Sequence, residues 1–133
     1  MNLTVGKLAQ AAGVGVETIR FYQKRGLLQQ PNRSGSGYRI YQPDDVARIR
    51  FIKHAQSVGF TLKEIADLIQ LEQDSRSRCG DLKVRADEKI RLIDEKIAEL
   101  NRMRNELAQL SSSCASDQPL SECKLIGCLS GTC

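Results

Sequence analysis

Hydrophobic residues in the first part of the chain recur at helical spacing. Between residues 5 and 12 they repeat every three or four positions behind Thr4, a residue type that caps helix N-termini, and Gly13 ends the pattern. A second short amphipathic segment, residues 16–25, closes at Gly26. Two short helices joined by a glycine-containing turn predict a helix-turn-helix.

A polar stretch separates these helices from two more. Residues 29–45 are rich in Pro, Gly and Ser, and they alternate in character over residues 38–41, which predicts a short hairpin or wing. Pro43 opens a third helix whose apolar stripe runs to Gly59, and the sequence TLKE at 61–64 predicts a capping box at the start of a fourth. The pattern indicates a compact winged helix-turn-helix domain.

From about residue 77 to residue 110 the pattern changes to one long helix. Its apolar residues alternate at spacings of three and four, which is typical of a coiled-coil seam, and Arg104 interrupts the strict register. The seam consists of Ala86, Ile90, Ile93, Ile97, Leu100, Leu107 and Leu110. We therefore predict a mostly α protein in three parts. These are a winged helix-turn-helix DNA-binding domain (1–72), a dimerisation helix that forms an antiparallel coiled coil (75–112), and a cysteine-containing metal-binding loop and tail (113–133).

Charge and composition narrow the function. The 133-residue chain has a net charge of +4, and residues 1–60 contain nine Lys and Arg against three Asp and Glu, which favours a polyanionic partner. The N-terminus has no signal-peptide core, and no stretch approaches the ~18 apolar residues of a membrane span. We therefore expect a cytoplasmic protein with no membrane partner. Since no cofactor loop, CxxC pair or nucleophile–base grouping is visible, we expect no enzymatic activity.

Cysteine thiols are the most distinctive chemistry in the chain. Of the five cysteines, Cys79 lies near the start of the long helix and the other four fall within residues 114–133. In a reducing cytoplasm, cysteines are more often metal ligands or redox sensors than structural disulfides. The one histidine, His54, is expected to be a surface or packing residue rather than a ligand. The cysteines therefore indicate a metal or redox role.

Three motifs together resemble the MerR family of transcription regulators. They are ETIRFYQKRGLL at 17–28, GYRIY at 37–41 and GFTLKEI at 59–65, and the similarity covers residues 3–126. The resemblance implies a homodimer on a palindromic operator between promoter elements that lie too far apart. It further implies repression without effector. With effector bound, the protein would distort the DNA so that RNA polymerase engages both elements.

Candidate DNA contacts lie on the second helix and the wing, and their side-chain types suit phosphate contact and base-edge recognition. They are Thr18, Arg20, Tyr22, Tyr38, Arg39 and Tyr41. The alternative for Tyr22 and Tyr41 is packing between the wing and the helix. A second set of cations is expected to make general phosphate contacts or to face solvent: Lys24, Arg25, Arg48, Arg50 and Lys53.

Cys79 and Cys114 cannot bind one ion within a single chain. A continuous helix between them would span roughly 50 Å at ~1.5 Å per residue. If two such helices pair antiparallel, however, Cys79 of one chain meets Cys114 of the other, and Cys123 folds back to the same place. Each dimer would then contain two sites of three thiolates, built across the interface.

These three cysteines match the ligand positions of the mercury-responsive branch of the family. Three thiolates without nitrogen or oxygen partners favour a soft ion, so Hg(II) is the expected effector. Copper- and gold-type relatives lack the Cys79 equivalent, and lead-type relatives have a further cysteine where this chain has Val14. This chain has Lys124 where mercury-type members usually have proline, and it adds Cys128 and Cys133.

Three alternatives therefore stay open. The two extra cysteines are either unliganded tail thiols or ligands that shift preference toward Pb(II), Cd(II) or Zn(II). A thiol redox switch on the same scaffold would oxidise Cys114 and Cys123 to a disulfide. A metal-buffering or thiol-transfer protein would leave the basic N-terminal half unexplained.

Overall fold

The computed structural model describes residues 2–33, 39–114 and 116–131, without the side chains of residues 32, 33 and 39. It divides into two compact units, Met1–Ala86 and Asp87–Cys133. The division falls inside one long helix, so the three predicted domain boundaries stay a prediction.

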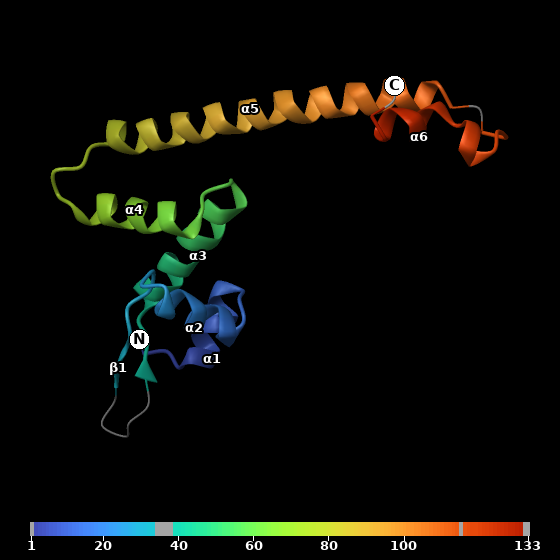
Figure 1. The fold of residues 1–133 in the computed structure, drawn as a ribbon. Helices are drawn as coiled ribbons and strands as arrows, with labels where there is room; N and C mark the ends of the chain where they lie inside the picture. The colour runs from blue at the N-terminus through green and yellow to red at the C-terminus, as the bar shows by residue number, and fades with distance from the viewer. Residues whose placement is uncertain (1, 34–38, 115, 132–133) are drawn as a thin grey trace. The chain divides into compact units, whose positions relative to one another are not determined.

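Four helices and a two-stranded hairpin make up most of the first unit (Figure 1). In chain order these are α1 (Val5–Ala12), α2 (Val16–Lys24), β1 (Asn32–Arg33), β2 (Arg39–Ile40), α3 (Pro43–Ser57) and α4 (Leu62–Gln73). The long helix α5 (Cys79–Ser112) begins in this unit and continues through the second. The second unit ends with a 3-10 turn, η1 (Leu120–Glu122), and α6 (Lys124–Leu129). The mostly helical, winged helix-turn-helix architecture is therefore confirmed.

Side-chain caps define the helix ends at the positions that the sequence predicts. The Thr4 hydroxyl accepts a hydrogen bond from the Lys7 amide at 3.3 Å, and Gly13 ends α1 with a left-handed φ of 71°. At α4, the Glu64 amide donates to the Thr61 hydroxyl at 3.1 Å, and the Glu64 carboxylate accepts from the Thr61 amide at 2.8 Å. The predicted capping box is therefore present.

The predicted wing is an antiparallel hairpin with a short ladder. Asn32 pairs with Ile40 and Arg33 with Arg39, while the tip lies outside the described residues. Leu3 extends the sheet through two hydrogen bonds of 2.8 Å with the backbone of Tyr41. This bridge connects the N-terminus to the base of the wing.

One hydrophobic core holds α1, α2, α3 and α4 together with the base of the wing. Its fully buried members come from all of these elements: Leu8, Ile19, Tyr41, Ile49, Ile52 and Ile65. Helix α3 packs against both α1 and α4. Because the core contacts α2 along its whole inner face, the outer face of α2 has a fixed orientation within the unit.

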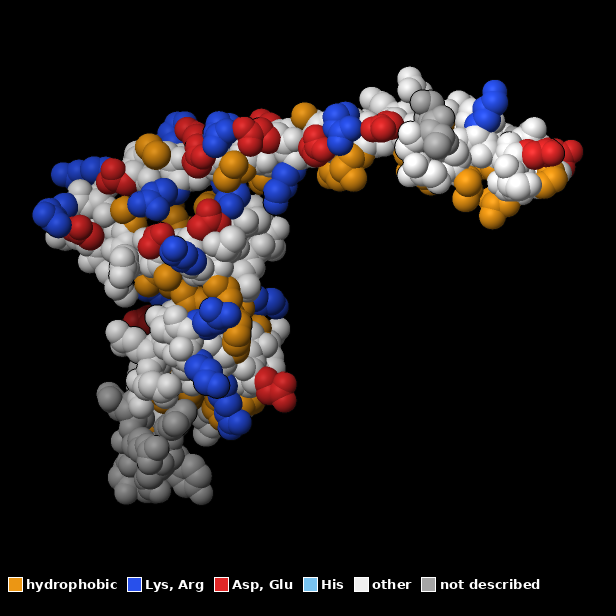
Figure 2. All heavy atoms as spheres, viewed as in Figure 1, with side chains coloured by type: hydrophobic (Ala, Val, Ile, Leu, Met, Phe, Trp, Pro, Cys, Tyr) orange, Lys and Arg blue, Asp and Glu red, His pale blue; other side chains and the backbone are white. Residues whose placement is uncertain are grey.

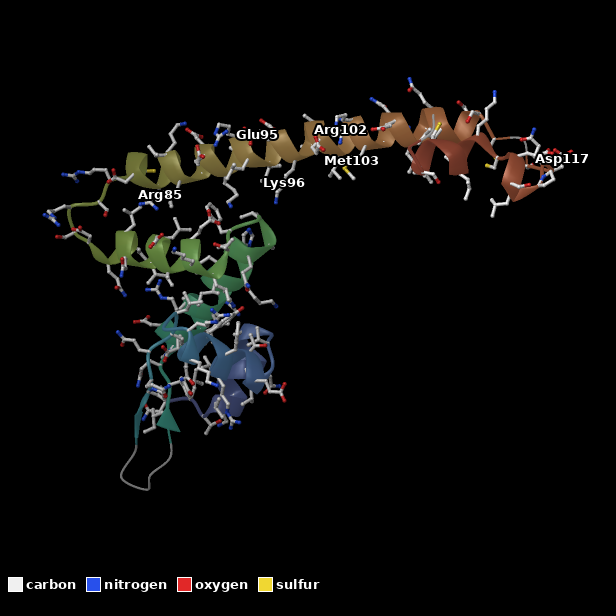
Figure 3. The ribbon with its side chains drawn as sticks, viewed as in Figure 1. Arg85, Glu95, Lys96, Arg102, Met103 and Asp117 are labelled. Atoms are coloured by element: carbon white, nitrogen blue, oxygen red, sulfur yellow. The ribbon has the colours of Figure 1, made fainter. Side chains whose placement is uncertain are left out.

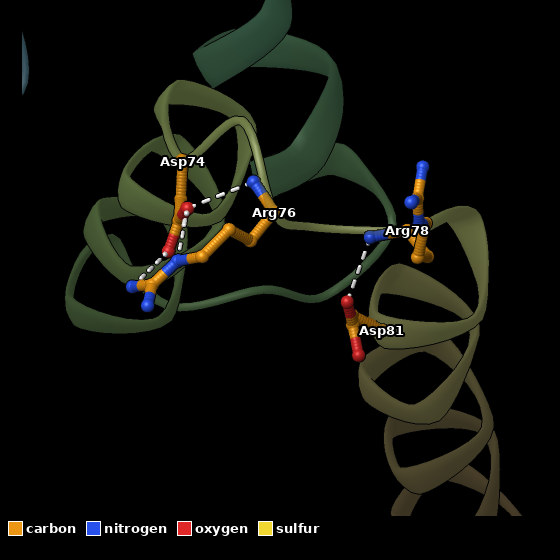
Figure 4. Close-up of polar contacts among 4 residues, drawn as sticks. All are labelled: Asp74, Arg76, Arg78 and Asp81. Atoms are coloured by element: carbon orange, nitrogen blue, oxygen red, sulfur yellow. Dashed lines mark hydrogen bonds and ion pairs between the residues drawn. The ribbon is translucent and has the colours of Figure 1, made fainter.

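A short charged connection leads from α4 into α5 (Figure 4). The Asp74 carboxylate accepts hydrogen bonds from the backbone and side chain of Arg76 at 2.9 to 3.2 Å. The Asp81 carboxylate accepts from the Arg78 amide at 2.7 Å, at the N-terminal end of α5. The bond to Asp81 satisfies a backbone amide that the start of α5 would otherwise leave without a partner.

Helix α5 has 34 residues, none of them buried in the described chain. Acidic and basic side chains alternate along one edge, whereas hydrophobic side chains emerge from the other (Figure 2). Arg91 pairs with Glu88 and Glu95 on the charged edge, and Arg102 repeats the arrangement. Figure 3 shows Met103 on the edge opposite Arg102. The exposed apolar edge includes Ile90, Ile93, Ile97, Leu100, Met103 and Leu107.

The tail differs from the predicted loop by two short helices, η1 and α6. Cys123 stands at the N-cap of α6, and its carbonyl oxygen accepts a hydrogen bond from the Gly127 amide at 3.3 Å. The tail therefore contains ordered elements close to one of the predicted metal ligands.

Candidate functional site

Helix α2 has one buried face and one exposed face. Ile19, Tyr22 and Gln23 are buried, and they follow the spacing of three and four that defines one side of a helix. The exposed residues of the helix are Glu17, Arg20, Phe21 and Lys24. Arg20 is therefore accessible, and Thr18 is half-buried at the boundary between the two faces, while the contact of both residues with DNA stays a prediction.

Two of the predicted tyrosines lie in the core: Tyr22 of α2 and Tyr41, which directly follows β2. Tyr22 is 3% exposed and donates from its hydroxyl to the Gln56 side-chain oxygen at 2.9 Å, and burial raises the pKa of Tyr22. Tyr41 is 1% exposed, and its hydroxyl oxygen accepts from Nε2 of Gln23 at 2.8 Å. These positions favour the packing alternative for both rings, while their contact with DNA stays a prediction.

Two other predicted contacts belong to the wing. Tyr38 lies outside the described residues. Arg39 belongs to β2 and pairs with Arg33 across the hairpin, but its side chain is outside the described part. The hairpin therefore carries Arg39 next to the tip of the wing, and its role in DNA binding stays a prediction.

Several of the remaining basic side chains have partners within the protein. Nη2 of Arg50 donates to the Ala11 carbonyl oxygen at 3.0 Å, and Nζ of Lys53 donates to that of Gly13 at 3.1 Å. Both cations therefore satisfy carbonyl groups at the C-terminal end of α1, where positive charge is favourable. Arg48 pairs with Glu72 at 3.0 Å.

An aromatic contact orients a further cation near the exposed face of α2. The Arg25 guanidinium lies 5.2 Å from the ring centroid of Phe21. Phe21 is 43% exposed, although the sequence analysis did not select it. The helical spacing of Glu17, Arg20 and Phe21 was the signal that could have identified it.

The second unit brings two of the three predicted metal ligands together. The Cys114 and Cys123 thiols lie near enough for the charge of one to influence the ionisation of the other. Negative charge on Cys123 raises the pKa of the Cys114 thiol. The backbone amides of Ile126 and Leu125, in the first turn of α6, hold the pKa of Cys123 below its usual value. The tail therefore contains two interacting thiols, and the pKa of one of them, Cys123, is lowered.

Cys79, the third predicted ligand, is an exposed thiol in the first unit. It lines a cavity of about 770 Å³ together with apolar residues of α3, α4 and α5. Those residues include Phe51, Leu68, Leu71 and Leu82. The Cys79 sulfur is therefore accessible from solvent.

Within the described residues of one chain, no three His, Cys, Asp or Glu side chains gather as a metal site. Cys128 is disulfide-bonded, and His54 is exposed on α3, as expected for a surface residue. Two adjacent thiols with amide donors to one sulfur suit a soft metal ion, which prefers thiolate. The chemistry of these two thiols therefore fits such an ion, while their role as metal ligands stays a prediction.

A core-anchored helix-turn-helix, a wing and a long helix with an exposed apolar edge define a winged helix-turn-helix regulatory protein. The family described as "MerR HTH family regulatory protein" matches residues 3–72, and the one described as "MerR, DNA binding" matches residues 46–110. The chain belongs to the MerR family, whose members are DNA-binding regulators.

Three known members of comparable length are similar to this chain over nearly all of its residues. It is 43% identical over 130 residues to the mercuric resistance operon regulatory protein of Shigella flexneri, covering 98% of this chain and 89% of that one. Among solved structures, PbrR691 from Ralstonia metallidurans CH34 in complex with lead(II) superposes with a TM-score of 0.87 at 32% identity, covering 96% and 98% of the two chains. The MerR of Bacillus megaterium MB1 in complex with mercury(II) gives 0.76 at 35% identity, covering 96% and 99%.

None of the helices in the described ranges combines the length and apolarity that a membrane span needs.

Proposed function

We propose that this chain is a metal-responsive transcription regulator that acts as a homodimer on operator DNA in the cytoplasm. Without metal it represses a metal-resistance promoter. With metal bound it distorts the operator so that RNA polymerase engages the promoter, and mercury(II) is the metal. One observation carries the metal-binding part of the proposal: the Cys114 and Cys123 thiols influence each other's ionisation just after α5, a helix that begins at a third cysteine, Cys79.

The DNA half of the proposal rests on the exposed face of α2. Arg20 is exposed there, and Thr18 lies at its edge, so both are available for base or phosphate contact. Arg39 supplies a cation from the wing. Tyr22 and Tyr41 contribute to DNA binding by fixing α2 against α3 and the wing, since both hydroxyls are hydrogen-bonded within the protein.

The metal half requires two chains. A helix of 34 residues is about 50 Å long at ~1.5 Å per residue, so Cys79 and Cys114 of one chain lie too far apart for a shared ion. Antiparallel pairing along the apolar edge of α5 would cover its exposed side chains. It would also bring Cys79 of one chain to Cys114 and Cys123 of its partner. The three thiolates would hold the ion across the interface.

The choice of mercury(II) rests on the donor type and on the relatives. An all-thiolate set favours soft ions over harder ones. The Shigella flexneri relative is named a mercuric resistance operon regulator, whereas a structure of similar fold was solved with lead(II). Lead(II) is therefore the first alternative, followed by cadmium(II) and zinc(II).

The test is transcription from an operator-bound dimer titrated with Hg(II), Pb(II), Cd(II) and Zn(II) in competing thiol. We expect activation by Hg(II) at the lowest free concentration. Cys123→Ser should abolish the response, whereas Cys128→Ser, which changes a disulfide-bonded cysteine of the same tail, should retain it. An equal response to Zn(II), or a normal response from Cys123→Ser, would overturn the proposal.

The contact between the two tail thiols also favours a second candidate, a thiol redox switch on the same DNA-binding unit. In that case Cys114 and Cys123 would form a disulfide, and promoter activity would follow peroxide or diamide rather than metal. Activation by metal under strictly reducing conditions separates the two functions.

A further inference from the structure

Helix α2 exposes an aromatic ring that the hydrophobic core does not use. Phe21 is 43% exposed, whereas the next residue, Tyr22, is 3% exposed. The two rings are tilted against each other, with their centroids 6.2 Å apart. Among the described residues, Phe21 belongs neither to the core of the first unit nor to the half-buried hydrophobic residues that pack against it. The position of this ring on the exposed face of α2 therefore calls for a role outside the core.

Arg25, the cation beside this ring, has a fixed backbone. It is the C-cap of α2, and its amide donates to the Phe21 carbonyl oxygen at 3.0 Å. Gly26 follows with a left-handed φ of 76°, and the Leu27 amide donates back to the Tyr22 carbonyl oxygen at 2.9 Å. Leu27 is itself buried. The end of the helix therefore fixes where the Arg25 side chain starts, and the side chain alone remains to be oriented.

The Phe21 ring supplies that orientation. Residues four positions apart lie on the same side of a helix, and helical side chains point back toward the N-terminus. In agreement with this, the guanidinium carbon of Arg25 lies over the Phe21 ring, 5.2 Å from its centroid. Arg25 has no carboxylate partner among the described residues, whereas Arg48 pairs with Glu72. A guanidinium that stacks on a ring keeps its N–H groups available for an anion.

We propose that Phe21 is a positioning residue for DNA binding, whose ring holds the Arg25 guanidinium in place to bind a phosphate of the operator. The inference rests on the proposed function, because it requires the exposed face of α2 to lie against DNA. In helix-turn-helix proteins the N-terminal part of the second helix reaches the base edges in the major groove. A cation at the opposite end of that helix lies farther out, where the sugar-phosphate backbone borders the groove.

The ring contact improves binding by ordering the arginine in advance. A long cationic side chain loses rotamer freedom when it binds a phosphate, and a contact that already restricts the side chain reduces this loss. Phe21 has no polar side-chain atom, so replacing it removes no hydrogen bond to DNA. A cation–π contact at an exposed site is weak, and its loss should weaken DNA binding about two- to fivefold.

A double-mutant cycle on the full-length protein tests the role of Phe21. The probe is a duplex that the protein selects from a random-sequence pool, and its affinity is measured by fluorescence anisotropy over a series of salt concentrations. Arg25→Gln should weaken binding and lower the slope of the salt dependence by about 1. Phe21→Leu should weaken the parent protein about two- to fivefold but should cause no further loss in the Arg25→Gln background. Phe21→Tyr keeps the ring and should bind like the parent.

Lys24→Gln is the matched control. Lys24 is an exposed cation at the same end of α2, and it has no ring contact among the described residues. Phe21→Leu should therefore weaken the Lys24→Gln protein by the same factor as the parent. Circular dichroism and gel filtration check that each variant is folded and dimeric. Phe21→Tyr and Arg25→Gln keep the test decisive if Phe21→Leu is unstable, through the rescue and the salt slope.

Three results would overturn the inference: an equal loss from Phe21→Leu with and without Arg25, an unchanged salt slope in Arg25→Gln, or weak binding by Phe21→Tyr. The outcome is distinguishable from that of the proposed function. Coupling of the two residues in DNA binding without a metal response would contradict the regulator proposal alone. A metal response without this coupling would contradict the positioning role alone, and a parent protein that binds no duplex would contradict both.

Discussion

The hydrogen bond between α2 and the base of the wing gives a quantitative prediction. Tyr41 is 1% exposed and Gln23 is 7% exposed, and Nε2 of Gln23 donates to the Tyr41 hydroxyl oxygen at 2.8 Å. Tyr41→Phe keeps the buried ring but removes the acceptor. The Gln23 amide then loses this partner in a site that water does not reach. We expect a loss of about 1–3 kcal/mol in the free energy of unfolding, the usual cost of leaving a buried donor without a partner.

Tyr22→Phe is the matched control. Its hydroxyl donates to Gln56, which is exposed, so water can replace the lost donor. The expected loss is about 1 kcal/mol or less. A second comparison uses Gln23→Leu together with Tyr41→Phe. Removing both polar groups leaves no donor unsatisfied, and part of the stability should return.

Urea denaturation followed by circular dichroism measures these differences at a fixed protein concentration, because the stability of a dimer depends on concentration. Operator binding measured by gel shift should weaken for Tyr41→Phe, since the bond connects the base of the wing to α2. The reasoning fails if Tyr41→Phe is no more destabilising than Tyr22→Phe, or if the double variant is less stable than Tyr41→Phe alone.

Three further predictions concern DNA binding, dimerisation and thiol reactivity. Arg20→Ala should weaken specific operator binding by about 1–3 kcal/mol in a gel shift while leaving dimerisation intact, and parental affinity would remove Arg20 from the interface. Ile97→Cys in a cysteine-free background should form an interchain disulfide on mild oxidation, because Ile97 lies near the midpoint of α5 on its apolar edge. Arg91→Cys, on the charged edge, should not, and equal cross-linking of the two would contradict the antiparallel seam. At neutral pH, Cys123 should be alkylated faster than Cys114, because the lowered pKa of Cys123 leaves more of it as thiolate while the pKa of Cys114 is raised. Mass spectrometry of the two peptides measures the two rates, and equal rates would contradict this prediction.

Helix boundaries in the first unit were predictable from sequence because their signals are local. Thr4 and Gly13 flank α1, and the Thr61 and Glu64 pair opens α4. Each of these residues acts on backbone groups within a few positions of itself. Local chemistry of this kind requires no knowledge of the remaining chain.

The roles of Tyr22 and Tyr41 were not decided by residue type. A tyrosine suits both a phosphate contact and a core position, and only the packing of α2 against α3 and the wing distinguishes them. In the structure Ile19, Tyr22 and Gln23 form one buried face, apart from the exposed Arg20, whereas the sequence analysis grouped Tyr22 with Arg20 as a candidate DNA contact. For Tyr41, the deciding partner is Gln23, eighteen positions away.

The short helix of the tail could not be predicted from its composition. Helix α6 has six residues, which is too short for periodicity to be informative, and short helices are unstable on their own. The position of Cys123 as its N-cap follows from the fold. The same holds for the contact with Cys114, since nine positions along the chain permit many separations of the two sulfurs.

A mixed dimer provides the most direct test of the central claim, that each metal site uses ligands from both chains. Cys79→Ser and Cys114→Ser homodimers should each fail to respond to metal, since every site lacks one thiolate. In a purified heterodimer of the two, one site combines both substitutions. The other unites the intact Cys79 of one chain with Cys114 and Cys123 of its partner. Equilibrium dialysis with Hg(II) in competing thiol should find about one tightly bound ion per heterodimer. The absence of any tightly bound ion would contradict a metal site that is shared between the two chains.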